Sequence, residues 1–195
     1  MSKFDHSQCK GITLTILLVS VLSWSGVTYS DTGLEQIEKS LEEGSSIRHV
    51  DVENILSSLN KHSDNTYLFD VRDPDEYAVS HLAGAIRLDP ESDPGDFLET
   101  YGYLLEQGDV IFYCAVGTRS TELAQLIADL IDDQASHAEF SAAAPANMKG
   151  GIFHWHNDSL PLVDTEGSTD FVHPYSWFQK RLLLRKDKAS YVPAH

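Results

Sequence analysis

The chain is poor in cysteine, in basic residues and in long apolar runs. Its 195 residues hold two cysteines, Cys9 and Cys114, and no C-x-x-C pair, which excludes dithiol redox chemistry. Only 14 Lys and Arg stand against 30 Asp and Glu, and the resulting net charge of −16 argues against a nucleic-acid partner. The hydrophobic content of 42% and the charged content of 23% are typical of a globular protein.

The apolar run over residues 12–22 is shorter than the about 20 residues that span a bilayer. It follows a polar stretch with Lys3 and Lys10 and precedes small and polar residues over 23–30, which is the layout of a secretory signal. We expect residues 1–30 to be a signal peptide, with export to the periplasm. The alternative is a signal anchor that holds the protein on the membrane, facing the periplasm. Cleavage would leave Cys114 as the one cysteine and so exclude an internal disulfide.

Cys114 stands between an apolar strand pattern over 109–113 and an amphipathic helix pattern. The apolar positions of that helix recur at helical spacing and are Leu123, Leu126, Ile127, Leu130 and Ile131. The first amides of a helix have no intrahelical partner and favour anions. Gly117 lets the turn curl tightly, and Arg119 adds a permanent positive charge. The turn therefore favours a thiolate, the reactive form of cysteine, over a merely buried thiol.

Strand and helix patterns alternate along the rest of the chain. Strands are expected over 47–50, 66–71, 84–88, 109–113 and 137–141. Helices are expected over 31–44, from Asp51, from Asp73 and over 97–106, and a short helix follows a turn at 149–151. Residues 142–147 read as a small-residue insertion. This alternation predicts an α/β fold with a parallel sheet covered on both faces. Ligand sites in such sheets lie at the carboxyl ends of the strands, where Asp70 and Cys114 fall.

Three motifs in this order resemble those of single-domain rhodaneses, which are sulfurtransferases. They are Asp70-Val71-Arg72 with Glu76-Tyr77 and residues 81–86, the Cys114–Ser120 loop, and Gly150-Gly151-Ile152 with Trp155. Ser80 stands where that family usually has glycine. The resemblance implies a three-layer α/β/α domain over residues 47–165 with about five parallel strands. Residues 31–46 would precede it as a helix or linker, and residues 166–195 would follow as a basic tail or helix.

The resemblance also implies a mechanism. The Cys114 thiolate would take the outer sulfur of thiosulfate or a similar donor, and the persulfide would pass that sulfur to a thiophilic acceptor. The loop amides would hold the persulfide, and Arg119 would bind the sulfonate group. The substrate-binding residues would be Ala115, Val116, Gly117, Thr118, Arg119 and Ser120. Neither a metal nor an organic cofactor is implied.

Two other functions compete with this interpretation. A C-x5-R phosphatase needs one residue more than the four that separate Cys114 from Arg119, so its loop is too long for this sequence. A persulfide carrier would use the same loop but would deliver sulfur to a protein partner with little turnover of its own. Failure to turn over with small acceptors would favour the carrier.

Several residues outside the loop remain open to two interpretations. Asp70, Arg72 and Glu76 could act as acids and bases, but we favour a supporting ion-pair set. His154 and His156 hint at a metal, yet histidines two apart do not share a helix face. A helix over 177–186 either docks on the domain through Trp177, Phe178 and Leu182 or offers a basic surface to an anionic membrane or an acidic partner. We favour docking, so membrane contact would need this tail or an uncleaved N-terminal segment.

Overall fold

The computed structural model describes residues 33–61, 65–135 and 143–194. The predicted signal peptide and the predicted strand over 137–141 lie outside these residues. Within them, no helix is long and apolar enough to cross a membrane.

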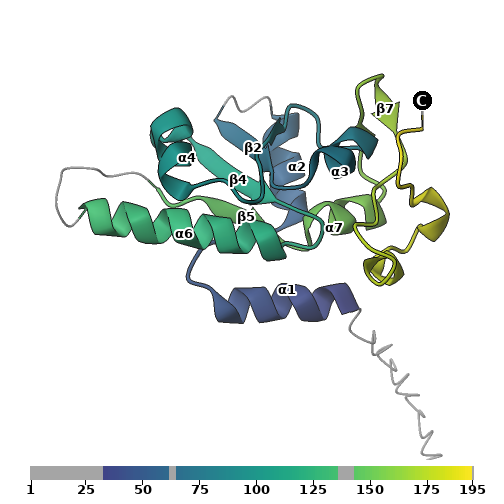
Figure 1. The fold of residues 1–195 in the computed structure, drawn as a ribbon, viewed down its shortest axis with the longest axis horizontal. Helices are drawn as coiled ribbons and strands as arrows, with labels where there is room; N and C mark the ends of the chain where they lie inside the picture. Colours follow the sequence, from purple (N-terminus) through teal and green to yellow (C-terminus); the bar gives the residue numbers. More distant parts are fainter. Residues whose placement is uncertain (1–32, 62–64, 136–142, 195) are drawn as a thin grey trace, which may run out of the picture.

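A five-stranded parallel sheet forms the centre of the fold (Figure 1). Its strands are β1 (His49–Val50), β2 (Thr66–Asp70), β3 (Ile86–Arg87), β4 (Asp109–Tyr113) and β5 (Ala146–Met148). They lie in the order β1-β5-β4-β2-β3. The predicted α/β class with a parallel sheet of about five strands is therefore confirmed. The expected strand positions hold for β1 to β4.

One strand of the sheet begins where the sequence pattern predicts a small-residue insertion. Ala146 and Asn147 were assigned to a small-residue insertion, but they begin β5, which pairs with both β1 and β4. All three residues of β5 are buried. A strand enclosed on both faces shows no polar–apolar alternation, so its short sequence carries little signal of its own.

Helices cover both faces of the sheet. The helices are α1 (Gly33–Gly44), α2 (Val52–Asn60), α3 (Pro74–Val79), α4 (Pro94–Tyr101), α5 (Leu104–Gln107), α6 (Thr118–Ala135) and α7 (Gly151–Asn157). The helix expected over 97–106 is divided into α4 and α5 near Gly102. In α6 the buried face includes Leu123 and Ile127, whereas Leu126, which was predicted on that face, is 54% exposed.

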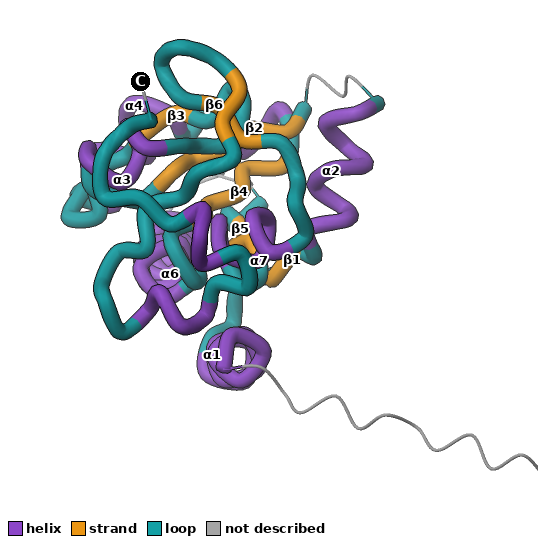
Figure 2. Tube along the Cα trace, turned by 90° about the vertical axis from the view of Figure 1, so that its right-hand side faces the viewer, coloured by secondary structure: helices purple, strands orange, loops and turns teal. Residues whose placement is uncertain are grey.

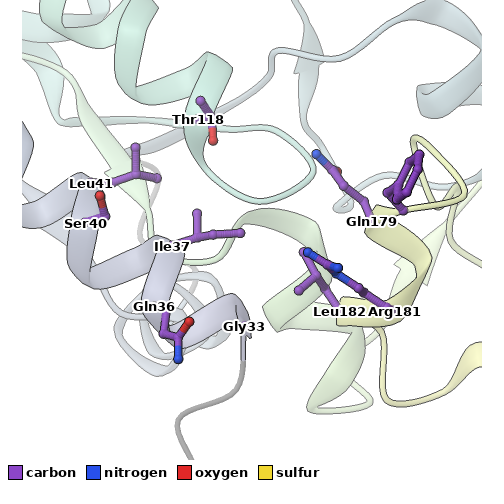
Figure 3. A pocket seen from close by; sticks show the side chains of 10 residues that line it. Gly33, Gln36, Ile37, Ser40, Leu41, Thr118, Gln179, Arg181 and Leu182 are labelled. Atoms are coloured by element: carbon purple, nitrogen blue, oxygen red, sulfur yellow. The ribbon is translucent and has the colours of Figure 1, made fainter.

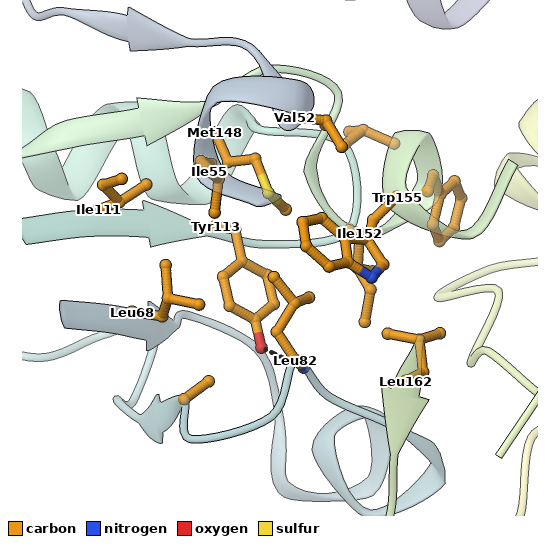
Figure 4. Close-up of a cluster of buried hydrophobic side chains, with 14 of the residues drawn as sticks. Val52, Ile55, Leu68, Leu82, Ile111, Tyr113, Met148, Ile152, Trp155 and Leu162 are labelled. Atoms are coloured by element: carbon orange, nitrogen blue, oxygen red, sulfur yellow. Dashed lines mark hydrogen bonds between the residues drawn. The ribbon is translucent and has the colours of Figure 1, made fainter. Parts of the chain in front are cut away.

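Alternating side chains of the strands divide the core into two clusters. Leu68 and Ile111 belong to a cluster that includes residues of α1, α2 and α7, and Figure 4 shows its side chains from α2 and α7. Phe69 and Phe112, their neighbours in sequence, pack with residues of α4, α5 and α6. Successive strand side chains point to opposite faces, so each strand serves both clusters. The result is the three-layer α/β/α arrangement that the resemblance implied.

The C-terminal segment, residues 164–194, runs back over the domain near α3 and α7 (Figure 1). It follows β6 (Leu162–Val163), which pairs with β7 (Ser168–Thr169) in a small antiparallel sheet. The segment is anchored by Val172 and Leu183, both fully buried. The predicted docking is therefore correct for Leu182, which packs against the core, but wrong for Trp177 and Phe178, which are 75% and 69% exposed.

The helix predicted over 177–186 is also wrong. Two short 3-10 turns stand there, Gln179–Leu182 and Lys186–Lys188. The Asn157 side chain donates to the Leu182 carbonyl at 3.0 Å and accepts from the Leu184 amide at 2.8 Å. Because the Asn157 side chain binds these two backbone groups, they do not form the hydrogen bonds of a continuing helix. Leu183, which lies between them, enters the core.

Candidate active site

Cys114 begins the loop that connects β4 to α6 at the carboxyl edge of the sheet. The thiol accepts a hydrogen bond from the Gly117 amide, with 3.2 Å between nitrogen and sulfur. Gly117 has a φ of 99°, a conformation that side chains disfavour, and this lets the loop turn back towards the sulfur. The first backbone bond of α6 runs from the Thr121 amide to the Gly117 carbonyl. The amides of residues 118–120 therefore precede the helical hydrogen-bond ladder, as predicted for an anion-binding turn.

The underside of the loop is fixed by α7. The amides of Ile152 and Phe153 donate to the carbonyls of Cys114 and Ala115 at 2.9 and 3.0 Å. A Cβ added at Gly151 would contact both of those carbonyl oxygens, the one of Ala115 at 2.7 Å. Gly151 is thus a point of close backbone approach to the Cys114 loop, whereas a Cβ at Gly150 would meet the side chains of Glu38 and His154.

Ser120 ties the start of α6 to the sheet. Its hydroxyl donates to Asn147 Oδ1 at 2.6 Å, and it also lies 3.1 Å from the Gly117 carbonyl oxygen. Asn147 is fully buried, and its Nδ2 lies 3.2 Å from His49 Nδ1. Sequence reasoning missed Asn147 because β5 was not recognised. An Asn between two small-residue stretches gave no periodic signal.

Arg119 is held by two carboxylates of α3 and its cap. Its two terminal nitrogens donate to Glu76 at 2.8 and 2.9 Å, and Nη1 also lies 3.3 Å from Asp73. Burial alone would lower the pKa of Arg119, but the hydrogen bonds with Glu76 and the negative charges of Glu76 and Asp73 outweigh it and raise that pKa above its usual value. The guanidinium therefore stays charged at the mouth of the loop.

The three predicted supporting residues do not form one set. Asp70 and Arg72 make a fully buried pair, with bonds of 2.7 and 2.6 Å, and Arg72 also donates to the Ser80 carbonyl. Glu76 joins Arg119 instead. Burial alone would lower the pKa of Arg72, but the charge of Asp70 and its hydrogen bonds outweigh this effect and raise the pKa above its usual value. Ser80, which stands where the family usually has glycine, is extended with a φ of −172°, so its backbone conformation does not require glycine.

A cavity of about 150 Å³ opens at the loop. Its lining residues are Cys114, Ala115, Val116, Thr118, Arg119, Tyr175 and Gln179. Tyr175 and Gln179 come from the C-terminal segment and were not among the predicted site residues. The Tyr175 ring lies 4.7 Å from the Arg119 guanidinium carbon, as in a cation–π contact. Tyr175 also adopts a φ of 58°, which is rare outside glycine. Such a contact between distant segments leaves no pattern in the sequence.

The paired histidines do not gather metal ligands. His154 bonds Glu38 of α1 at 2.7 Å, while buried His156 faces the Asp170 carbonyl at 3.1 Å. Across residues 33–61, 65–135 and 143–194, no group of three or more His, Cys, Asp or Glu side chains could hold a metal ion.

Comparison with known proteins agrees with this geometry. The sequence matches the rhodanese-like domain family over residues 51–158. It is 32% identical over 149 residues to the thiosulfate:glutathione sulfurtransferase of Saccharomyces cerevisiae, covering 71% of this chain and 99% of that protein. The chain belongs to the rhodanese-like family, and a sulfurtransferase is among its relatives.

Solved structures with a similar fold include a Bacillus halodurans protein and a rhodanese-like domain from Anabaena. The first is 19% identical with a TM-score of 0.49, covering 68% of this chain and 87% of that one. The second is 21% identical with a TM-score of 0.46, covering 61% and 80%.

Proposed function

We propose that this protein transfers the sulfane sulfur of thiosulfate to a thiol through a persulfide on Cys114. One observation carries the proposal: the Cys114 sulfur is held by the Gly117 amide in a small cavity that Arg119 also lines. The yeast relative is named for thiosulfate and glutathione, which supports the same donor and the same class of acceptor here.

The first half-reaction forms a sulfur–sulfur bond on the enzyme. The Cys114 thiol loses its proton to solvent, and the thiolate attacks the outer sulfur of thiosulfate. The bond between the two sulfurs of thiosulfate breaks, and sulfite leaves with the electron pair. The new terminal sulfur of the Cys114 persulfide is an anion, which the Gly117 amide and the first amides of α6 stabilise.

Arg119 keeps donors for the sulfonate group despite its carboxylate partners. Glu76 and Asp73 engage Nη1 and one side of Nη2. The Nε–H and the remaining Nη2–H point along the same edge of the guanidinium, and this edge can bind two sulfonate oxygens. The cavity of about 150 Å³ admits a small anion of this kind.

The second half-reaction restores the enzyme. The acceptor thiolate attacks the terminal sulfur of the persulfide, the bond to Cys114 breaks, and the Cys114 thiolate leaves with the electron pair. The product is the persulfide of the acceptor. No electrons enter or leave the system overall, so the cycle needs no redox partner.

Steady-state kinetics test this proposal. We expect sulfite release that depends on both thiosulfate and glutathione, with parallel double-reciprocal lines, because one product leaves before the second substrate reacts. Cys114→Ser should abolish turnover. Intersecting lines, or turnover that survives in Cys114→Ser, would contradict a persulfide on Cys114. A single equivalent of sulfite without turnover would favour the carrier instead.

A further inference from the structure

A second cavity adjoins the one at Cys114. It measures about 620 Å³ and lies between α1 and the C-terminal segment (Figure 3). Thr118 and Gln179 line both cavities, so the two meet at the start of α6. The smaller cavity suits a small anion, whereas the larger one has the volume typical of sites for organic molecules.

The larger cavity combines an apolar wall with a few polar groups. Ile37, Leu41 and Leu182 supply the apolar wall. Arg181 is an exposed residue of the lining, and within the described parts of the chain it makes no ion pair. Each of the other five arginines, by contrast, makes an ion pair with a carboxylate. Its fork of donors suits a carboxylate.

Gln179 offers a second polar group where the cavities meet. Its Oε1 is buried and has no hydrogen-bond partner among the described residues. Buried polar atoms are normally paired, so an unpaired carboxamide at a cavity wall points to a ligand. Figure 3 shows the Gln179 side chain extending from the C-terminal segment towards the loop before Thr118. A side-chain carboxamide there matches the peptide group of a ligand, which both donates and accepts.

We propose that this cavity is the acceptor subsite and that it binds a small peptide thiol bearing carboxylates. Arg181 pairs with a carboxylate of the acceptor, and Gln179 hydrogen-bonds its peptide group. The thiol then enters the Cys114 cavity past Thr118 and attacks the terminal sulfur of the persulfide. This assignment rests on the proposed sulfur transfer and names the part of the molecule that selects the acceptor. Both walls come from segments outside the matched family domain of residues 51–158.

Comparing glutathione with cyanide as the acceptor tests the acceptor subsite separately from the sulfur transfer. Glutathione is a small peptide thiol that carries carboxylates, whereas cyanide can react at Cys114 without the larger cavity. We expect Arg181→Ala to raise the KM for glutathione about tenfold and Gln179→Ala to raise it about fivefold, in keeping with the loss of a charged and a neutral hydrogen bond. In Arg181→Ala, whose site lies outside the Cys114 cavity, the KM for thiosulfate and the rates with cyanide should change little.

Further variants test the assigned contacts. Arg181→Lys should recover part of the affinity because the positive charge is restored. Lys186→Ala is the matched control, since Lys186 is an exposed basic residue of the same segment that does not line the cavity. Glutathione dimethyl ester, which lacks free carboxylates, should have a high KM with the wild type, and Arg181→Ala should not change that KM.

The outcomes are distinguishable. Wild-type turnover with cyanide but unchanged glutathione KM in both alanine variants would overturn the acceptor subsite and leave the sulfur transfer standing. Equal losses of turnover with glutathione and with cyanide in Arg181→Ala would also overturn the acceptor subsite, because the substitution would then be disturbing the Cys114 loop. No turnover with either acceptor would overturn the proposed function itself.

Discussion

At the scale of single residues, the reactive loop depends on a glycine that is distant from it in sequence. Gly151 has a φ of 55°, and the backbone oxygens of Cys114 and Ala115 occupy the space where a side chain would start. Two of the loop carbonyls accept hydrogen bonds from the residues that follow Gly151. The position of the Cys114 backbone is therefore set by how closely α7 can approach it.

Gly151→Ala should displace this loop. The added methyl group meets carbonyl oxygens that the α7 amides hold, and alanine is strained at this φ. We expect the free energy of unfolding to fall by roughly 2–4 kcal/mol, as for other substitutions that force backbone movement. We expect most of the sulfurtransferase activity to be lost. Urea denaturation and the sulfite assay measure the two effects.

Gly84→Ala provides the matched control. Gly84 has a similar φ of 77°, but nothing lies within 4 Å of an added Cβ. That variant should lose only about 1 kcal/mol for the backbone strain and keep its activity. Equal behaviour of the two variants would show that the close contact with the loop has no special role.

At the same scale, the sequence allowed some site residues to be predicted and not others. Cys114 and the loop up to Ser120 were found because a strand pattern, a glycine and a helix pattern follow one another directly. Asn147 and Gln179 reach the loop and its cavity only through the tertiary fold. Neither belongs to a periodic pattern, so no local signal pointed to them.

At the scale of elements, α1 is attached to the domain by ionic contacts at two places. His154 of α7 bonds Glu38, and Lys149 contacts Glu42 at 2.6 Å and Asp51 at 2.8 Å. Hydrogen bonds with Asp51 and Glu42 raise the pKa of Lys149 to about 12. The hydrogen bond with Glu38 raises the pKa of His154 above its ordinary 6.5, although burial opposes this. Only the His154 contact therefore changes charge near neutral pH.

The docking of α1 should weaken as the pH rises. A raised pKa in the folded state means that the His154–Glu38 contact stabilises the protein fully below about pH 6.5 and that this contribution is lost as the pH passes the raised value. His154→Gln should therefore be less stable than wild type at about pH 5.5, with the difference shrinking by about pH 9. Urea denaturation at both pH values measures it.

Glu38→Gln is the companion variant, because it removes the other partner of the same contact. It should show the same loss of stability at low pH. A wild-type advantage that stays constant over this range, or that grows with pH, would contradict the assignment. Comparing each variant with wild type also cancels the effects of His49, His156 and His173, whose burial lowers their pKa values.

Element prediction succeeded where periodicity was long and failed where tertiary contacts decided the conformation. The 18-residue helix α6 and the strand β4 follow their sequence patterns closely. The C-terminal segment does not, because Asn157 binds its backbone and Leu183 enters the core. Its run of Arg, Lys and Leu is typical of a helix, but the hydrogen bonds from Asn157 hold the backbone in another conformation.

At the scale of the whole molecule, two added segments flank a family domain. The parallel sheet and the Cys114 loop lie within or next to residues 51–158, where the sequence matches the family. Helix α1 and the C-terminal segment lie outside that range, and Figure 2 shows α1 as a separate helix beside the domain. We propose that the domain carries out the sulfur transfer and that the added segments select the acceptor.

The formation of a persulfide on Cys114 is tested most directly by the intact mass of the purified protein before and after incubation with thiosulfate. We expect the wild type to gain the mass of one sulfur atom, cyanide to remove that atom, and Cys114→Ser to gain no mass. A wild type that stays unchanged, or a gain that persists in Cys114→Ser, would contradict a persulfide formed from thiosulfate on Cys114.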